Sequence, residues 1–300
     1  PVSTKTVTSI PVTAETGDAV IVDVPTKLGY TPNRRTVLGI VNPNGTITTV
    51  DKVTYDPNPV EATVSIPSAT LDSTGDPVNK QPVTSALVDG STGDTVTVDV
   101  PTKPGYTPSQ STVTGTVNPD RTITTKDKVT YTPNAVTNTV SIPSTTLTSA
   151  GTPVDNQPVT SAPVDGHTGD TVTVAVPTKP GYTPSQTTVT GTINPDGTIT
   201  TKDKVTYTPN AVTNTVSIPS TTVDSTGTPV DTEPVISAPI NGHTGDTVEV
   251  DVPTKPGYTP SQATVTGTIE PDGSISTKDK VTYTPNTVTF KQGEPAQLTF

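Results

Sequence analysis

Two histidines, His167 and His243, are the only side chains of the sequence with an ordinary pKa near neutrality. They lie one 76-residue period apart, and the positions one and two periods before His167 hold Ser91 and Glu15. A nucleophile such as serine needs a base within hydrogen-bond reach in every working copy of a site. The variation is typical of a solvent-facing loop, so we expect no catalytic residues and no enzymatic activity.

Carboxylates around glycines could bind calcium, which takes six to eight oxygen ligands. The segments 89–94 and 165–170 each carry two aspartates separated by a Gly-x-Thr-Gly run. At the position of the first aspartate, other copies have Asn241 and Thr13. The ligand set is therefore not maintained, and the sequence favours a plain turn before a strand. We expect neither a metal site nor a cofactor.

A lysine, an asparagine and a buried acid could form an intramolecular isopeptide cross-link. Lys179, Asn210 and Asp203 are the candidates within one copy. The charged segment 201–204 is more typical of an exposed bend, so the cross-link is the less favoured interpretation.

Tyrosines could contact a glycan, because sugar rings stack on aromatic faces. Tyr207 ends an alternating segment and is expected in the core, whereas Tyr182 follows Pro180-Gly181 in a predicted loop. Packing against Gly191 or the neighbouring copy is the competing interpretation for Tyr182. The candidate glycan contacts are Tyr30, Tyr106, Tyr182 and Tyr258.

These residues belong to a tandem repeat. Gly-Tyr-Thr-Pro recurs at the four candidate tyrosines, and Val-Thr-Tyr recurs at Tyr55, Tyr131, Tyr207 and Tyr283, always 76 residues apart. Such arrays serve reach or multivalency more often than catalysis. The predicted domains are repeat 1 (1–58, truncated at its N-terminus), repeat 2 (59–134), repeat 3 (135–210), repeat 4 (211–286), and a different module or tail (287–300).

Composition narrows the class of protein. The net charge of −11 argues against nucleic acid and anionic membranes as partners, and the lack of cysteine removes disulfides and thiolate sites. No segment approaches the roughly 20 apolar residues needed to cross a bilayer. With 28% hydrophobic and 3% aromatic residues, each repeat can build only a thin core of Val and Ile.

Alternation within repeat 3 predicts strands. In residues 136–142, Val136, Val140 and Ile142 share one parity, and residues 171–176 alternate strictly; both segments end at prolines, with a turn-rich stretch between them. Residues 188–193 and 198–200 flank Asn-Pro-Asp-Gly, a hairpin signature, and 205–207 form the closing strand. In repeat 2 Arg121 stands in the place of Gly197, which predicts that positive φ is not required there. We expect mainly β modules with little helix in a rod-like array.

The full pattern resembles mucin-binding-protein repeats, closest to the B2-like half of such repeats in lactobacillus surface adhesins. The residues that carry this resemblance are Val140-Ser141-Ile142, Gly151-x-Pro153-Val154, Gly169-Asp170, Val176-Pro177, Pro180-Gly181-Tyr182-Thr183-Pro184, Gly191-Thr192, Asp196-Gly197-Thr198-Ile199-Thr200 and Val205-Thr206-Tyr207-Thr208-Pro209. It covers nearly all of residues 1–286. The sequence departs from the family because it has few aromatic residues and because no B1-like partner precedes each repeat.

The resemblance implies a β-grasp-like, ubiquitin-related module on a secreted protein of the bacterial surface, anchored covalently to the Gram-positive cell wall. It also implies adhesion to host mucin or other glycoproteins, with immunoglobulin binding in some members, and we expect a monomeric rod without membrane insertion. Two hypotheses follow. Either the repeats bind mucin-type glycoproteins weakly and multivalently, or they form a purely structural stalk that projects another adhesive domain.

Overall fold

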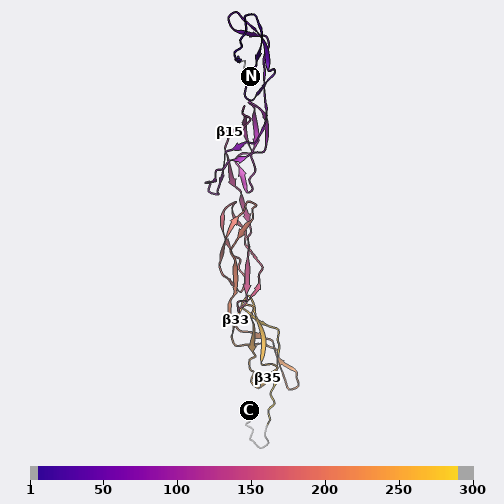
Figure 1. Cartoon of the computed structure of the whole chain (residues 1–300). Helices are drawn as coiled ribbons and strands as arrows, with labels where there is room; N and C mark the ends of the chain where they lie inside the picture. The colour runs from indigo at the N-terminus through magenta and orange to yellow at the C-terminus, as the bar shows by residue number, and fades with distance from the viewer. Residues whose placement is uncertain (1–5, 290–300) are drawn as a thin grey trace. The chain divides into compact units, whose positions relative to one another are not determined.

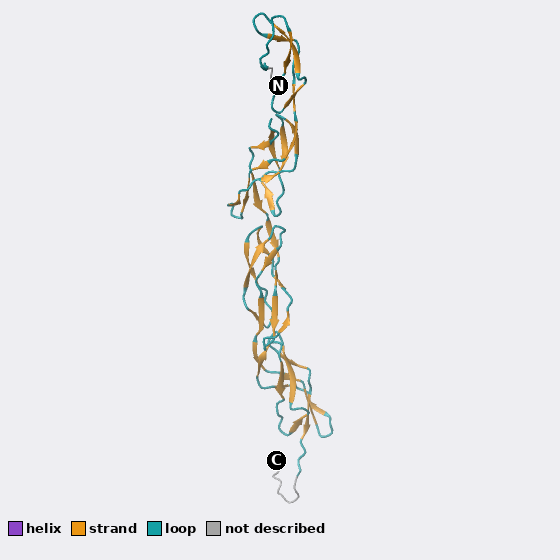
Figure 2. Ribbon diagram, in the orientation of Figure 1, coloured by secondary structure: helices purple, strands orange, loops and turns teal. Residues whose placement is uncertain are grey.

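The computed structural model describes residues 6–289, which contain β-strands and turns and no helix (Figures 1 and 2). The expected mainly β class is confirmed, while the β-grasp topology stays a prediction. The predicted tail 287–300 falls almost entirely outside the described residues, as does the start of repeat 1. Across residues 6–289 there is no helix of the length and hydrophobicity that crossing a membrane requires.

The chain forms two compact units. The first comprises the residues up to Val136 together with Gly166–Asp170 and Asn194–Gly197, and the second comprises Thr137–Asp165, Thr171–Ile193 and the residues from Thr198 onward.

The strands recur in the same order along the chain. Repeat 1 contains β1 (Ala19–Asp23), β2 (Tyr30–Pro32), β3 (Thr36–Val41), β4 (Ile47–Thr49) and β5 (Tyr55–Pro57). Repeat 2 contains β6 (Pro59–Ala62), β7 (Ser65–Ile66), β8 (Ser68–Leu71), β9 (Pro77–Asn79), β10 (Val83–Thr84), β11 (Val88–Ser91), β12 (Thr95–Asp99), β13 (Tyr106–Pro108), β14 (Thr112–Val117), β15 (Ile123–Thr125) and β16 (Val129–Pro133).

The two later repeats have eleven strands each. Those of repeat 3 are β17 (Ala135–Asn138), β18 (Ser141–Ile142), β19 (Ser144–Leu147), β20 (Pro153–Asp155), β21 (Val159–Thr160), β22 (Val164–His167), β23 (Thr171–Ala175), β24 (Tyr182–Pro184), β25 (Thr188–Ile193), β26 (Ile199–Thr201) and β27 (Val205–Pro209). Those of repeat 4 are β28 (Ala211–Asn214), β29 (Ser217–Ile218), β30 (Ser220–Val223), β31 (Pro229–Asp231), β32 (Val235–Ile236), β33 (Ile240–His243), β34 (Thr247–Asp251), β35 (Tyr258–Pro260), β36 (Thr264–Ile269), β37 (Ile275–Thr277) and β38 (Val281–Pro285).

Repeat 4 shows how each complete repeat is built. One sheet has the order β31-β30-β38-β35, and a second has the order β34-β36-β37. All pairings are antiparallel except β30 with β38, which run parallel with Thr222 opposite Tyr283. Parallel strands need a long connection. Here the connection between β30 and β38 comprises most of the repeat. The parallel pairing therefore joins the first third of repeat 4 to its last strand.

The core lies between these sheets and consists of small β-branched residues around one tyrosine. Tyr283 has no exposed surface, and the same holds to within 1% for Tyr131 and Tyr207. In repeat 4 the other buried members are Val216, Ile218, Val250, Val252, Val265, Ile269, Ile275 and Val281. The predicted core position of the Val-Thr-Tyr tyrosine is thus confirmed for the three complete repeats. In repeat 1, β5 pairs with β2 alone among the described strands, and Tyr55 is only half-buried.

The clear alternations of repeat 3 give the expected strands β23, β25, β26 and β27. The stretch predicted to be turn-rich contains β19 to β22, and Tyr182 begins strand β24 instead of lying in a loop. Those strands have two to four residues, too short for an alternation to stand out. A serine side chain stabilises the shortest pair, β18 with β21: the Val140 N–H donates to Ser161 Oγ, and that hydroxyl donates to the Ala162 carbonyl at 2.7 Å.

The hairpin glycine position does require positive φ, contrary to the expectation from Arg121. Arg121 itself has φ of 73°, close to the 81° of Gly197, and both N–H groups close the same turn onto Asn118 and Asn194. A residue with a Cβ is strained in this region by roughly 1–2 kcal/mol, whereas glycine is not.

We therefore expect Arg121→Gly to stabilise repeat 2 by about 1 kcal/mol, since relief of strain exceeds the extra entropy of unfolded glycine. The matched change Gly197→Arg should destabilise repeat 3 by a similar amount, because a Cβ at Gly197 meets no atom within 4 Å. Denaturant unfolding of the two variants measures both effects. Equal stability of all three proteins would contradict the assignment of strain to Arg121.

Candidate functional site

The four candidate glycan-contact tyrosines begin equivalent strands, β2, β13, β24 and β35. Each is half-buried and lies antiparallel to the closing strand of its own repeat, as Tyr182 does opposite Pro209. The ring is therefore fixed by a sheet and offers only part of its surface to solvent.

A lysine lies over this tyrosine and the core tyrosine in every repeat. Lys179 Nζ is 5.4 Å from the ring centroid of Tyr182 and 5.9 Å from that of Tyr207. The same ammonium donates a 2.6 Å hydrogen bond to Thr146 Oγ1. Cation–π contacts at this range are attractive. Sequence reasoning missed this role, although Lys-x-Gly-Tyr recurs at Lys27, Lys103, Lys179 and Lys255.

Hydrogen bonds and burial shift several pKa values around this lysine. In repeat 4, a 2.8 Å hydrogen bond from Lys255 is the main cause that lowers the pKa of Asp231, and the Glu233 N–H adds to it. Burial raises the pKa of Tyr207, whose hydroxyl donates to the Pro177 carbonyl at 2.6 Å. Each group is thereby held in the form that its structural contact needs, Asp231 as the anion and Tyr207 as the neutral donor.

The Gly-Tyr segment of repeat 3 packs on repeat 4 within the second compact unit. A Cβ built on Gly181 would lie 2.6 Å from Thr244 Cγ2 and 2.9 Å from the backbone of Pro271. The hydroxyl of Tyr182 lies 3.4 Å from the Cβ position of Gly245. Glycine is required at position 181 both by this approach and by its φ of +77°.

One asparagine holds the junction together with both its backbone and its side chain. The Asn210 N–H donates to the Gly181 carbonyl at 2.8 Å, and its side chain accepts from Thr183 Oγ1 at 2.7 Å, both within repeat 3. Its carbonyl accepts from the Thr244 N–H of repeat 4 at 3.0 Å. Asn210 therefore ties the end of one repeat to the turn between β33 and β34 of the next.

The first compact unit contains the same junction between repeats 1 and 2. Asn58 donates to Gly29 and accepts from the Thr92 N–H at 3.0 Å. The hydroxyl of Tyr30 lies 3.5 Å from the Cβ position of Gly93. Tyr106 has the same relation to Gly169, which belongs to that unit as well.

Tyr258 differs from the other three candidates. Gly257 beside it has φ of +79°, yet no described atom lies within 4 Å of its Cβ position. The competing interpretation, packing on a neighbouring repeat, therefore describes Tyr30, Tyr106 and Tyr182. A glycan contact at any of the four stays a prediction.

The candidate catalytic and metal-binding residues stabilise turns through their hydrogen bonds. The Asp170 carboxylate accepts from the His167 N–H at 3.0 Å, and Asp246 does the same for His243. No cluster of three or more possible metal ligands occurs among residues 6–289. The proposed cross-link partners have separate roles: Asp203 accepts from the Thr190 N–H at 2.8 Å, Asn210 holds the junction, and Lys179 binds Thr146.

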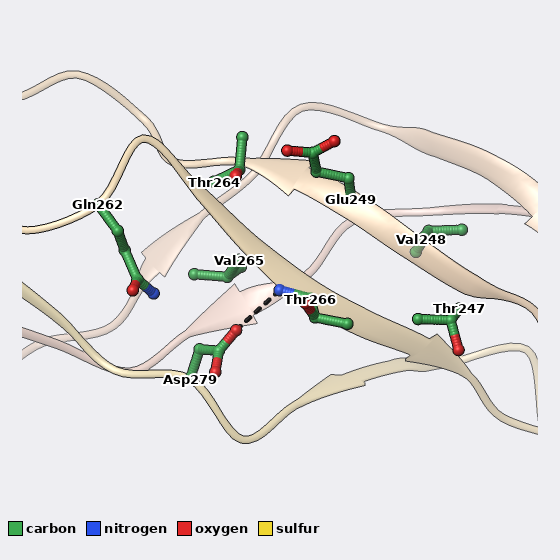
Figure 3. A pocket seen from close by; sticks show the side chains of 8 residues that line it. All are labelled: Thr247, Val248, Glu249, Gln262, Thr264, Val265, Thr266 and Asp279. Carbon is green, nitrogen blue, oxygen red and sulfur yellow. Dashed lines mark hydrogen bonds between the residues drawn. The ribbon is translucent and has the colours of Figure 1, made fainter.

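A polar hollow of about 530 Å³ lies on the outer face of β34 and β36 (Figure 3). Its lining residues are Thr247, Val248, Glu249, Gln262, Thr264, Val265, Thr266 and Asp279. Asp279 accepts from the Thr266 N–H at 2.8 Å, as Asp203 does in repeat 3, whereas Glu249 replaces Thr97 and Thr173 of the other repeats. Hydroxyl, amide and carboxylate groups of this kind can hydrogen-bond sugar hydroxyls.

No family model matches the chain, and no curated protein does either. Several solved structures are similar, and two of them show the low identity. The Bacillus anthracis TIE protein is 12% identical with a TM-score of 0.27, over 85% of this chain and 57% of that one. The pilus adhesin SpaC from Lactobacillus rhamnosus GG is 10% identical with a TM-score of 0.23, over 83% and 45%. The chain spans about half the length of these two proteins, and scores this low do not define a common topology.

Gly181→Ala should loosen the junction, because the added Cβ enters contacts with Thr244 and Pro271. Gly257→Ala is the matched control, with the same backbone strain of about 1 kcal/mol and no atom to meet. Hydrogen exchange of the Thr244 N–H, which crosses the junction, should speed up only in the first variant. Identical exchange rates of the Thr244 N–H in the two variants would show that packing at Gly181 does not stabilise the junction.

Proposed function

We propose that this chain is a spacer, the repeat region of a secreted protein on a Gram-positive cell surface that holds an adhesive part away from the wall. The observation that carries this proposal is the junction at Asn58 and Asn210, where the residues that could have formed a binding surface are used to join consecutive repeats. A connection built from hydrogen bonds and close packing restricts the motion of neighbouring repeats, which a spacer needs.

The pattern of variation agrees with this function. The positions that could serve chemistry differ between repeats, as His167 and Ser91 do, whereas the lysine, the two tyrosines and the junction asparagine recur. We propose that the chain is not an enzyme and acts as a monomer.

Binding of host mucin-type glycoproteins is the second candidate. The hollow in Figure 3 and, separately, Tyr258 of the same repeat favour it, since the hollow offers groups that pair with sugar hydroxyls and Tyr258 offers a half-buried ring. Single contacts of this kind are weak, but tethered copies rebind at high effective concentration. Immunoglobulin is a further ligand to test on the same surface.

The spacer proposal predicts a long particle in small-angle X-ray scattering. With strands that rise about 3.3 Å per residue, four repeats in line should reach a maximum dimension on the order of 150 Å or more. Versions with two, three and four repeats should lengthen by equal steps. A dimension that grows only as the cube root of the mass would contradict the proposal.

The glycoprotein proposal predicts that the chain is retained on a mucin-coated sensor. Glu249→Thr gives repeat 4 the residue found in repeats 2 and 3, so the protein should fold normally and bind less. Thr173→Glu makes the opposite change in repeat 3 and should bind more. Absence of binding by the unchanged chain would leave the spacer as the whole function.

A further inference from the structure

Repeat 2, which carries β15 in Figure 1, has a second hollow of different chemistry. Its volume is about 540 Å³, within the range of small-ligand sites. It lies over the parallel pair β8 and β16, where Ala69 is opposite Thr130. The lining residues are Ser65, Pro67, Ser68, Ala69, Lys80, Pro82, Lys128, Val129 and Thr130.

The lining is positively charged in a chain of net charge −11. Lys80 and Lys128 are exposed, and no described residue forms an ion pair or hydrogen bond with either ammonium group. No carboxylate lines the hollow. Two unpaired ammonium groups beside one small depression favour an anion.

The rest of the lining is suited to a sugar ring. Pro67, Ala69 and Pro82 provide an apolar floor for carbon-bound hydrogens. The hydroxyls of Ser65 and Thr130 can exchange hydrogen bonds with ring hydroxyls.

The same place in repeat 3 differs at two positions. Thr145 stands where Ala69 is, and Asn156 stands where Lys80 is. The Thr145 hydroxyl of β19 donates to Asn156 Oδ1, just after β20, at 3.1 Å, so these two side chains pair with each other. In repeat 4 the two positions hold Thr221 and Thr232. Alanine and lysine in repeat 2 thus remove this hydrogen bond and add a charge.

We propose that this hollow binds a carboxylated monosaccharide unit, with the carboxylate between Lys80 and Lys128 and the ring on the proline and alanine floor. Both ammonium groups then form charge-assisted hydrogen bonds to one carboxylate. The lining has no aromatic ring on which the sugar could stack. We therefore expect weak binding, with a Kd on the order of 1 mM. It is independent of the spacer function, because neither junction asparagine, Asn58 or Asn134, is among its lining residues.

The test is a titration of the full chain, labelled with ¹⁵N, with sodium glucuronate. Saturable shifts are expected at the amides of Ala69, Lys80 and Thr130, and none at the equivalent Thr145 and Asn156. Glucose is the neutral control and acetate the control for charge alone, and both should bind more weakly. Salt should weaken the response, since exposed charges are screened.

The variant Ala69→Thr with Lys80→Asn reproduces the residues of repeat 3, where the fold accepts them. It should lose the saturable shifts, and Lys128→Asn alone should weaken binding by up to about fivefold, the effect of one exposed charge pair. The reverse variant, Thr145→Ala with Asn156→Lys, should gain the site in repeat 3. If Ala69→Thr with Lys80→Asn fails to fold, the appearance of glucuronate binding in repeat 3 of the reverse variant tests the proposal instead.

Three outcomes would overturn the proposal: equal shifts with glucose and glucuronate, equal shifts with acetate and glucuronate, or shifts of the same size in repeats 2 and 3. None of them would affect the scattering test of the spacer.

Discussion

Every complete repeat depends on one parallel strand pairing. In repeat 3, β19 and β27 place Thr146 beside Tyr207, residues separated by most of the repeat. Tyr207 fills the core from this position, its hydroxyl bonds to Pro177, and Lys179 covers its ring while bonding to Thr146. A core of small valines and isoleucines contributes little area for its length. The parallel pair with its tyrosine and lysine therefore supplies the long-range contact that closes the module.

The junction uses the same segment in a second way. The strand that pairs with the end of β27 begins at Tyr182, and the glycine before it receives Thr244 of the next repeat. One short sequence, Lys-x-Gly-Tyr-Thr-Pro, thus contributes to the core, the sheet edge and the connection. A residue with several structural contacts cannot be substituted without disturbing the fold, so these positions recur in every repeat. The residues that line the hollows have fewer such contacts, and the positions of Ala69 and Glu249 differ between repeats.

Much of the fold could be predicted from alternation and period. The long runs 171–176 and 188–193 identify their strands because five or six β-branched and polar residues alternate, and the buried Tyr207 follows from its place at the end of such a run. Strands β19 to β22 have too few residues for a pattern, and side-chain contacts that no spacing reveals stabilise them, such as the hydrogen bond from Ser144 of β19 to the Gln157 carbonyl. The left-handed Arg121 shows that replacement of a glycine does not remove a backbone requirement. The lining of each hollow depends on which residues of paired strands lie opposite one another, as Thr130 lies opposite Ala69. Strand register of this kind cannot be predicted from the sequence alone.

The parallel closure also has a mechanical consequence. In repeat 4, β30 lies near the beginning of the module and β38 at its end, and they run in the same direction. Tension applied between the two ends of the repeat pulls these strands along their length in opposite directions. The backbone hydrogen bonds between them, with Tyr283 buried at one end of the pairing, then share the load in shear and must break together instead of one by one. Each complete repeat would thus resist force best along the direction in which its two ends are pulled apart.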